Sequence, residues 1–586
     1  FPSLIYHIKG TAVLNCGSFL FIIGSMWKKI LSLFLLVIMT GGCLASAVIQ
    51  RNGVEEDAGF AVTGEWYVAR HNALRPYPET ITYTLGKLTG SSNSNMPEGD
   101  TYENNAYTRY LKNKLNVQNK DVFETSGNSY NEYVSIAVAS GNLPDVFLVD
   151  SEEEVKKLAD EGLIADLTDA YDDCTSVHVK NIYGSYGDTI LEKAKVDGKL
   201  YALPETSVDD GPSLLWIRYD WLKKLNLPTP KTVSDVRRIV KEFMEKDPGG
   251  NGEGQTTGLV TEPGLYGVSD YSQEYQTDII FSSFDSYPGH WIYKDGQLVY
   301  GSIQPETKKA LEYLHEMYQD GTLDNDFLFR DSENITELIE SGRCGAFFGP
   351  WWSPNYPLME AISKDSDADW RPYLISTDSD GDTSFASQNP NGRFVVVRKG
   401  FAHPEIVMKI VSALFDFMPY GDESTKELES YYSDNVDVTA NPLGINVDFK
   451  NSLSTCYNHL QGVLSLGEDE SDLTVLEGSY YKACQDYLKE NNRRQKVNPK
   501  NWAVYTSRIV AAHRISDERV REVKSVYFSE TKTMRNSWWQ LNELEKKAFI
   551  SIVTGDEPLS YFDEFVREWM SEGGNNITQE VRKANE

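Results

Sequence analysis

The sequence has few cysteines and histidines and no recognisable catalytic motif. It contains six cysteines and eight histidines in 586 residues, and no CxxC or Cys/His spacing supports a zinc site or a redox motif. The patterns HExxH, GxSxG and GxxxxGK[ST] are also missing, which argues against zinc peptidases, serine hydrolases of that type and P-loop enzymes. Because the carboxylate pair of a glycosidase comes from distant strands, a carbohydrate-active enzyme stays open as an alternative.

Positive charge is scarce as well. The chain has 56 lysines and arginines against 87 aspartates and glutamates, which gives a formal net charge of -31. A chain this acidic is repelled by phosphate backbones and by anionic lipid surfaces. We therefore expect no nucleic acid partner and read the charge as a means of solubility outside the cell.

The apolar run near the N-terminus is too short for a membrane span. It covers residues 30–39 after Lys28 and Lys29, about half of the roughly 20 residues that a spanning helix needs. Basic residues, a short apolar run and then Gly41-Gly42-Cys43 predict a signal peptide over 26–42. Residues 1–25 precede Met26, a better start, and are expected to be upstream sequence that is not part of the native chain.

Cys43 is the predicted lipid-attachment site, since small residues lead into it as in a lipobox. Thr40 stands where that pattern usually has leucine, so secretion without a lipid is the alternative. Residues 43–77 mix glycine, acids and asparagine without periodicity, which is typical of a tether. We therefore expect the protein at the extracellular face of the cell membrane, held only by a lipid.

The remaining chain exceeds what one hydrophobic core usually serves, so two lobes are expected. The pattern of strand 80–88, helix 105–115 and strand 117–125 begins as a βαβ unit. Residues 422–490 are acidic and irregular, and no element is assigned there. Four cysteines follow Cys43, and the sequence leaves open free thiols or a Cys456–Cys484 disulfide; these four are Cys174, Cys344, Cys456 and Cys484.

Three segments in order carry a family resemblance: 139–146 (ASGNLPDV), 197–204 (DGKLYALP) and 216–225 (WIRYDWLKKL). With further matches at 246–252, 295–301, 345–352 and 552–555, the chain resembles family 1 extracellular solute-binding proteins, and within them the large lipoprotein branch with the alginate-oligosaccharide binders.

The resemblance implies an α/β type II periplasmic-binding-protein fold, with two lobes, a hinge and a cleft between the lobes. The lobes are expected at 78–205 with 385–460 and at 206–384 with 461–586. The implied function is capture of a small polar solute, foremost an oligosaccharide, for the permease subunits of an ABC importer, by a monomer without catalysis. A peptide-binding member of the same family is the alternative.

A saccharide cleft combines aromatic platforms with polar side chains. Trp351 and Trp352 are the first candidates, because they follow a Gly-Pro break at the end of a strand, and one of the two is expected in the cleft. The other candidate ligand-binding residues, each weighed against a role in the core or the fold, are Trp291, Trp216, Arg218, Glu205, Thr206, Tyr271, Tyr275 and Trp502.

Residues 247–258 match a loop that resembles an EF-hand and holds calcium in the alginate-binding relatives. Asp247, Asn251 and Glu253 are the candidate ligands, but glycine or glutamine occupies the third, ninth and twelfth positions. Calcium prefers several hard, negatively charged oxygens. A plain glycine-rich turn is therefore favoured over a calcium site, and no fixed cofactor is expected.

The lipid anchor can be tested directly. The substitution Cys43→Ala removes the thiol that would carry the lipid, so the protein should be released into the medium or stay unprocessed. Phase partitioning with Triton X-114 measures this. Identical partitioning of the wild type and the variant into the detergent phase would contradict the anchor.

Overall fold

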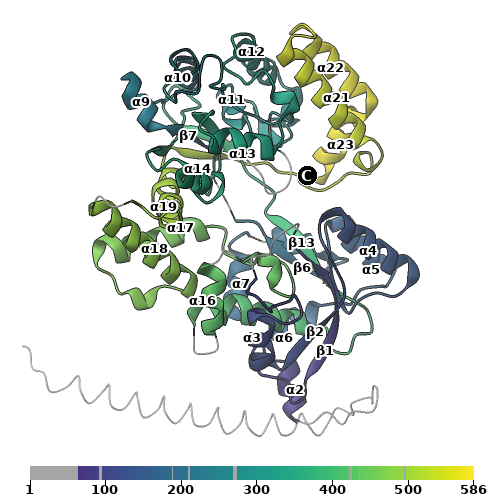
Figure 1. The fold of residues 1–586 in the computed structure, drawn as a ribbon. Helices are drawn as coiled ribbons and strands as arrows, with labels where there is room; N and C mark the ends of the chain where they lie inside the picture. The colour runs from purple at the N-terminus through teal and green to yellow at the C-terminus, as the bar shows by residue number, and fades with distance from the viewer. Residues whose placement is uncertain are drawn as a thin grey trace, which may run out of the picture. The chain divides into compact units, whose positions relative to one another are not determined.

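The computed structural model describes residues 64–90, 96–187, 189–208, 211–267, 274–421, 425–433, 436–493 and 496–585. The predicted signal peptide, Cys43 and Tyr271 lie outside the described residues. Residues Glu65–Glu586 form one compact unit, whose helices and strands are drawn in Figure 1. Their buried side chains form separate hydrophobic clusters. Among the described residues, no helix is both long and apolar enough to cross a membrane.

The first lobe is built on a five-stranded sheet with the order β2-β1-β3-β13-β6. The strands are β1 (Ile81–Leu88), β2 (Val117–Thr125), β3 (Val146–Val149), β6 (Ala202–Thr206) and β13 (Asn391–Val397). β1 runs parallel to β2 and β3, whereas β13 is antiparallel to β3 and β6. All four residues of β3 are buried, as expected for a strand that is covered on both faces.

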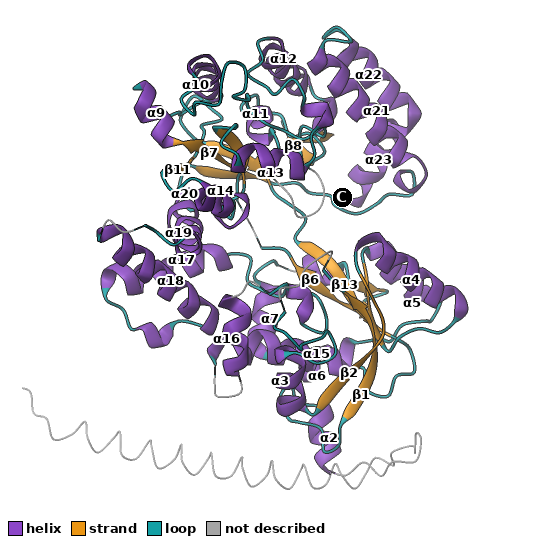
Figure 2. Cartoon of the chain, in the orientation of Figure 1, coloured by secondary structure: helices purple, strands orange, loops and turns teal. Residues whose placement is uncertain are grey.

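Helices lie on both sides of this sheet (Figure 2). They are α3 (Ala106–Leu115), α4 (Gly127–Ser140), α5 (Glu152–Asp160), α6 (Thr168–Cys174), α7 (Val177–Gly184), α8 (Thr189–Glu192) and α15 (Ile406–Ser412). A short hairpin is formed by β4 (Lys195–Val196) and β5 (Lys199–Leu200). Its turn residues Asp197 and Gly198 have φ of 50° and 77°, the left-handed conformation that a two-residue hairpin turn requires.

The second lobe has a smaller sheet and more helices. Its antiparallel sheet has the order β10-β7-β11, with β7 (Leu214–Arg218), β10 (Ala346–Gly349) and β11 (Trp370–Tyr373). β8 (Trp291–Lys294) and β9 (Gln297–Tyr300) form a hairpin. The helices are α9 (Tyr219–Leu225), α10 (Val233–Lys246), α11 (Asp278–Ser282), α12 (Pro305–Gln319), α13 (Ser332–Glu340), α14 (Met359–Lys364), α21 (Met534–Thr554), α22 (Tyr561–Trp569) and α23 (Asn575–Ala584).

Between the lobes the chain pairs β12 (Thr383–Ala386) in parallel with β14 (Val520–Val523). The hydrophobic cluster of the first lobe draws on 69–203 and 394–447, and that of the second lobe on 215–375 and 534–581. The α/β fold with two lobes, predicted from the resemblance, is thereby confirmed by the elements and their order.

Two expectations need correction. Residues 422–490, which carry no assigned element in the sequence reading, contain α16 (Lys426–Ser433), α17 (Ser452–Gln461) and α18 (Val475–Asn492), and α19 (Pro499–Tyr505) and α20 (Ala512–Ile515) follow. The start of α17 packs into a different core from the expected one, since Leu453 joins a cluster with residues of the second lobe.

The expected tether is also too long. Residues Gly64–Arg70 form helix α2, and Ala69 and Tyr77 are buried in the first lobe. The Lys409 amine donates to the carbonyls of Ala69, Asn72 and Arg75 at 2.8, 2.6 and 2.8 Å. This one buried amine fixes a segment with little hydrophobic periodicity of its own.

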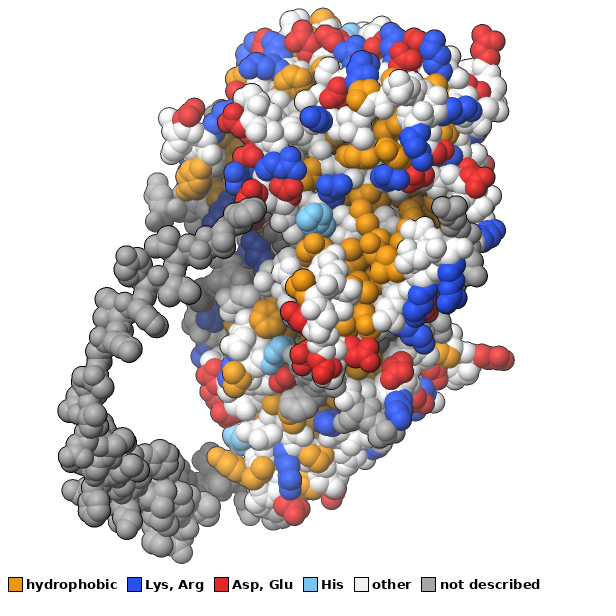
Figure 3. Space-filling model, turned by 90° about the vertical axis from the view of Figure 1, so that its left-hand side faces the viewer, with side chains coloured by type: hydrophobic (Ala, Val, Ile, Leu, Met, Phe, Trp, Pro, Cys, Tyr) orange, Lys and Arg blue, Asp and Glu red, His pale blue; other side chains and the backbone are white. Residues whose placement is uncertain are grey.

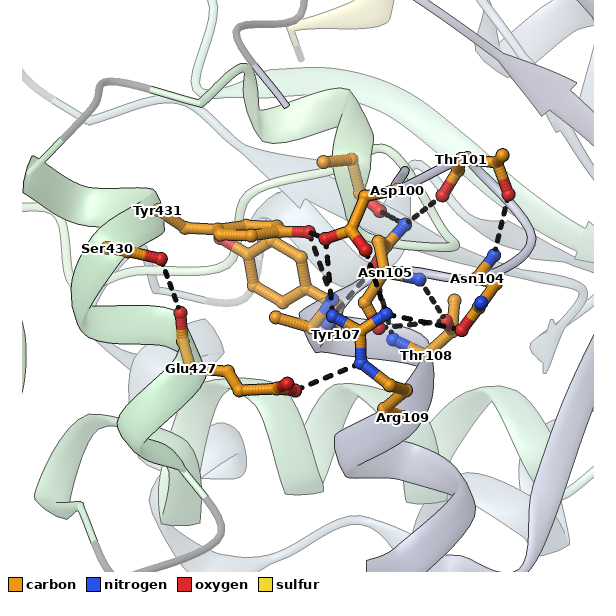
Figure 4. A network of polar contacts seen from close by, with 12 residues as sticks. Asp100, Thr101, Asn104, Asn105, Tyr107, Thr108, Arg109, Glu427, Ser430 and Tyr431 are labelled. Carbon is orange, nitrogen blue, oxygen red and sulfur yellow. Dashed lines mark hydrogen bonds and ion pairs between the residues drawn. The ribbon is translucent and has the colours of Figure 1, made fainter. Parts of the chain in front are cut away.

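A polar network joins α16 to α3 and the loop before it (Figure 4). The Arg109 guanidinium lies 2.9 Å from the Asp100 carboxylate and 3.0 Å from that of Glu427. The Tyr431 hydroxyl donates to Asp100 and accepts from the backbone N–H of Ala106 at 3.1 Å. Burial, followed by the bond to Asp100, raises the pKa of Tyr431 to about 12.

We predict that Tyr431→Phe destabilises the fold by about 1 to 3 kcal/mol, because it removes the side-chain acceptor of the Ala106 N–H and one of the two donors to an Asp100 carboxylate oxygen. Urea unfolding followed by circular dichroism measures the change. The matched control is Tyr293→Phe at an exposed tyrosine of β8, which should be neutral within about 0.5 kcal/mol. Equal midpoints for both variants would contradict a structural role of the network.

Candidate functional site

A cavity of about 1140 Å³ is lined by residues of the first lobe, of the second lobe and of the segments that join the two lobes. The first lobe contributes residues at strand ends, such as Asp150 directly after β3 and Glu205 and Thr206 in β6. The second lobe contributes α11 and the start of β8. The segment 525–530 after β14 closes another side. Strand ends of an open α/β sheet are the usual position of a ligand site.

Aromatic side chains cover much of the wall. The aromatic lining residues are Tyr287, Trp291, Trp352, Phe385, Phe394, Tyr527, Phe528 and Trp538. Their ring faces are suited to the C–H patches of sugar rings, and their surroundings supply hydroxyl, amide and carboxylate groups. The cavity is therefore equipped to hold a ligand that is both ring-shaped and polar.

Four of the ten predicted ligand residues line the cavity: Trp291, Trp352, Glu205 and Thr206. Trp352 follows β10 through Pro350, and the carbonyl of Pro350 accepts from the Trp216 indole N–H at 3.1 Å. Trp291 opens β8 with its ring centroid 5.0 Å from that of Tyr300. The Trp291 ring is thus packed against another aromatic residue, and the backbone two residues before Trp352 is fixed by the Trp216 indole.

Glu205 also braces the cavity wall. Its carboxylate accepts from the backbone N–H groups of Arg393 and Asn446, each at 3.1 Å. A side chain on Gly392 would collide with this carboxylate, so glycine is required there. Thr206 pairs with Asn446 through its N–H at 3.0 Å.

Five predicted residues are elsewhere. Trp216 and Tyr275 are fully buried, and the Tyr275 hydroxyl is 3.0 Å from that of Thr336. Trp351 packs in a core cluster with Trp502 at its margin, and the Arg508 guanidinium lies 4.5 Å above the Trp351 ring. Their apolar surface is thus used for packing, which removes them from the cavity wall.

Arg218 is engaged in ion pairs away from the large cavity. Its guanidinium lies 2.8 Å from Asp220 and 3.1 Å from Asp365. With Trp221 and Trp370 it lines a separate cavity of about 320 Å³. Arg218, a candidate ligand-binding residue, is therefore not among the residues that line the large cavity.

The loop considered for calcium is closed by its own hydrogen bonds. The Asp247 carboxylate accepts from the N–H of Asn251 and of Gly252 and from the Thr256 hydroxyl, at 3.0, 2.8 and 2.8 Å. The Asn251 amide donates to the Gly342 carbonyl at 3.0 Å, and Glu253 is exposed. Among the described residues, no cluster of three or more His, Cys, Asp or Glu side chains is placed to hold a metal ion.

The four cysteines after Cys43 are free and buried: Cys174, Cys344, Cys456 and Cys484. Burial raises the pKa of Cys344 and of Cys484 to about 12. Thiols that stay protonated are poor nucleophiles and poor metal ligands. Cys174 and Cys344 donate to the carbonyls of Arg70 and Ala346 at 2.8 and 3.3 Å, and all four thiols belong to buried clusters.

Several lining residues were missed by the sequence reading, among them Asp278, His290 and Trp538. Burial raises the pKa of Asp278 to about 7 and lowers that of His290 to about 4. The sequence feature that could have indicated this wall is the pair of neighbouring tryptophans Trp538 and Trp539. In the structure, Trp539 is 65% exposed, whereas the Trp538 ring packs against Tyr300 with the ring centroids 5.5 Å apart.

The structural comparison gives the fold class. The crystal structure of FusA of Streptococcus pneumoniae, an ABC-transporter substrate-binding protein in complex with kestose, superposes with a TM-score of 0.57 and 16% identity, over 86% of this chain and all of that one. The two-lobed fold of periplasmic solute-binding proteins is thus the fold of this chain.

The sequence comparison gives the family. The profile described as bacterial extracellular solute-binding protein matches residues 93–418, more than half of the chain. The chain therefore belongs to this family, which confirms the resemblance. Lipoprotein LipO of Bacillus subtilis is 24% identical over 467 residues, 78% of this chain and 84% of the relative. The polygalacturonan/rhamnogalacturonan-binding protein YtcQ of the same organism is 24% identical over 460 residues, 77% and 82% of the two chains.

The half-buried Asp278 of the cavity wall predicts a pH dependence of stability. Its folded pKa of about 7 exceeds the unfolded value of about 3.9, so the folded state keeps a proton that the unfolded state releases. The stabilisation is complete below about pH 4 and is lost as the pH rises through 7. Relative to wild type, Asp278→Asn should gain stability from pH 4 to 8, by at most about 4 kcal/mol.

Denaturant unfolding at several pH values measures this difference. The exposed Asp367→Asn variant is the control and should follow the wild type at every pH. A constant stability difference between Asp278→Asn and wild type over this range would show that Asp278 is ionised in the folded protein throughout.

Proposed function

We propose that the protein binds an oligosaccharide outside the cell and delivers it to the permease subunits of an ABC importer, without chemical change of the ligand. The observation that carries this proposal is the large cavity between the lobes, lined by eight aromatic side chains and by acids and amides. A single aromatic side chain could equally belong to a hydrophobic core. Many aromatic side chains around one polar cavity are instead expected where several sugar rings of one ligand bind side by side.

The relatives support this proposal. YtcQ is named for binding polygalacturonan and rhamnogalacturonan, and FusA of Streptococcus pneumoniae, 23% identical over 234 residues, is named a fructooligosaccharide ABC transporter substrate-binding protein. On the face shown in Figure 3, acidic and basic side chains of the described residues are interspersed and form no broad basic patch, which fits a small-molecule partner better than a nucleic acid.

The same proposal covers the anchor and the cofactor. A lipid on Cys43 would hold a monomer at the extracellular face of the membrane, as the name of the relative LipO suggests. The Asp247 loop would close through its own hydrogen bonds rather than around calcium. No fixed cofactor takes part in ligand binding under this proposal.

The neighbouring tryptophans provide the decisive pair of variants. Trp352→Ala removes a ring from the cavity wall and should weaken binding by about 2 kcal/mol, or about 30-fold, with a melting temperature near wild type. Trp351→Ala removes a core ring and should cost about 3 to 5 kcal/mol of folding stability. A panel of neutral and acidic tetrasaccharides, screened by thermal shift and then titrated by calorimetry, measures both effects.

The panel also tests the competing functions. Mass spectrometry of the incubated sugars should show no products; turnover that is lost on substitution of one cavity carboxylate would establish an enzyme instead. Stabilisation by peptides with no response to any glycan would establish a peptide-binding member of the family. Unchanged affinity of Trp352→Ala for the bound sugar would remove Trp352 from the ligand wall.

A further inference from the structure

The charges on the cavity wall are one-sided. Six carboxylate side chains line it: Asp150, Glu152, Glu153, Glu205, Asp278 and Glu530. Among the described lining residues, Lys193 is the only lysine or arginine. Between residues 65 and 435, the segments outside the described residues contain no lysine or arginine either. The wall therefore has very little positive charge to offer a ligand.

The cationic groups close to the wall are already engaged. The Lys193 amine donates to the Asn389 amide oxygen at 3.4 Å and lies 5.3 Å from the centre of the Phe528 ring. The guanidinium of Arg393, between two lining residues, lies 3.4 Å from the Asp150 carboxylate. His290 is neutral near pH 7 because burial lowers its pKa to about 4. A carboxylate on the ligand would have to compete for each of these groups.

The wall carboxylates are partly satisfied by donors of the protein itself. Glu152 accepts from the Ser529 hydroxyl at 2.8 Å, Glu153 from the N–H of Glu530 at 3.2 Å, and Glu205 from two backbone N–H groups. Each carboxylate oxygen has further lone pairs for hydroxyl donors. Such carboxylates need no bound cation, so hydroxyl-rich neutral ligands match them better than polyamines.

We propose that the cleft selects uncharged oligosaccharides and discriminates against sugars that carry carboxylates. This inference rests on the proposed function and makes it specific. A uronate chain would bring one negative charge per ring to a wall that already carries carboxylates, while Lys193 and Arg393 are already engaged with groups of the protein.

The first experiment compares ligands of one length by calorimetric titration of the full chain at pH 7. The probes are neutral tetrasaccharides of glucose, galactose, mannose and fructose, tetragalacturonate, and the fully deacetylated chitosan tetramer. We expect at least one neutral tetrasaccharide to bind about tenfold or more tightly than tetragalacturonate and than the chitosan tetramer, a difference in binding free energy of about 1.4 kcal/mol. Its affinity should change little between low and moderate salt.

The second experiment changes one wall charge. Glu530→Lys should lower the ratio of the tetragalacturonate Kd to the neutral-sugar Kd by about tenfold, since close charges in a partly desolvated site interact strongly. Glu564→Lys, at an exposed position of α22 outside the cavity, makes the same change in net charge. It should leave this ratio as in wild type, which separates local from overall charge.

The outcomes are distinct. Tightest binding of tetragalacturonate or of the chitosan tetramer overturns the selectivity and leaves oligosaccharide capture intact. An equal ratio in Glu530→Lys and Glu564→Lys shows that the wall charges do not select the ligand, and also overturns the inference. Binding of no glycan at all overturns the proposed function itself.

Discussion

The carboxylate of Glu205 holds together the place where the chain passes between the lobes. It accepts from two backbone N–H groups that lie 188 and 241 residues further along the chain. The first crossing begins just after β6, the second ends at β13, and the third begins just after Asp448, whose N–H donates to the Thr206 hydroxyl at 2.8 Å. One buried acid thus ties together all three crossings and the floor of the cavity.

The opposite wall depends on aromatic packing rather than on polar bonds. Tyr300 stacks on Trp569 with centroids 5.0 Å apart and contacts both Trp291 and Trp538. These rings come from a hairpin and from the C-terminal helices, so the last part of the chain fixes the ligand wall. Aromatic side chains that are already packed before binding lose little conformational freedom when the ligand binds, which lowers the entropic cost of binding.

Local sequence patterns predicted the strands and the approximate location of the site, but not which residues line it. β3 and the Asp197-Gly198 hairpin could be read directly, because an apolar run and a turn dipeptide are local features. Whether Trp351 or Trp352 faces the cavity could not be read, since it depends on Arg508 and a cluster contributed by α19 and α20. The segment 525–530 has no periodicity, and its long-range contacts with α5, with Trp291 of β8 and with Ser387 place it at the site.

The contacts between segment 525–530 and α5 also join the two sides of the cavity. The Ser529 hydroxyl and the Glu530 N–H donate to the first turn of α5, and Phe528 lies against the Lys193 amine. Each such polar contact contributes about 0.5 to 1.5 kcal/mol net, and the acids of α5 also line the cavity. A ligand that adds hydroxyl donors between these same acids and the aromatic wall would therefore add contacts of the same kind. The glutamates of α5 thus belong both to the acidic wall and to the contact between α5 and segment 525–530.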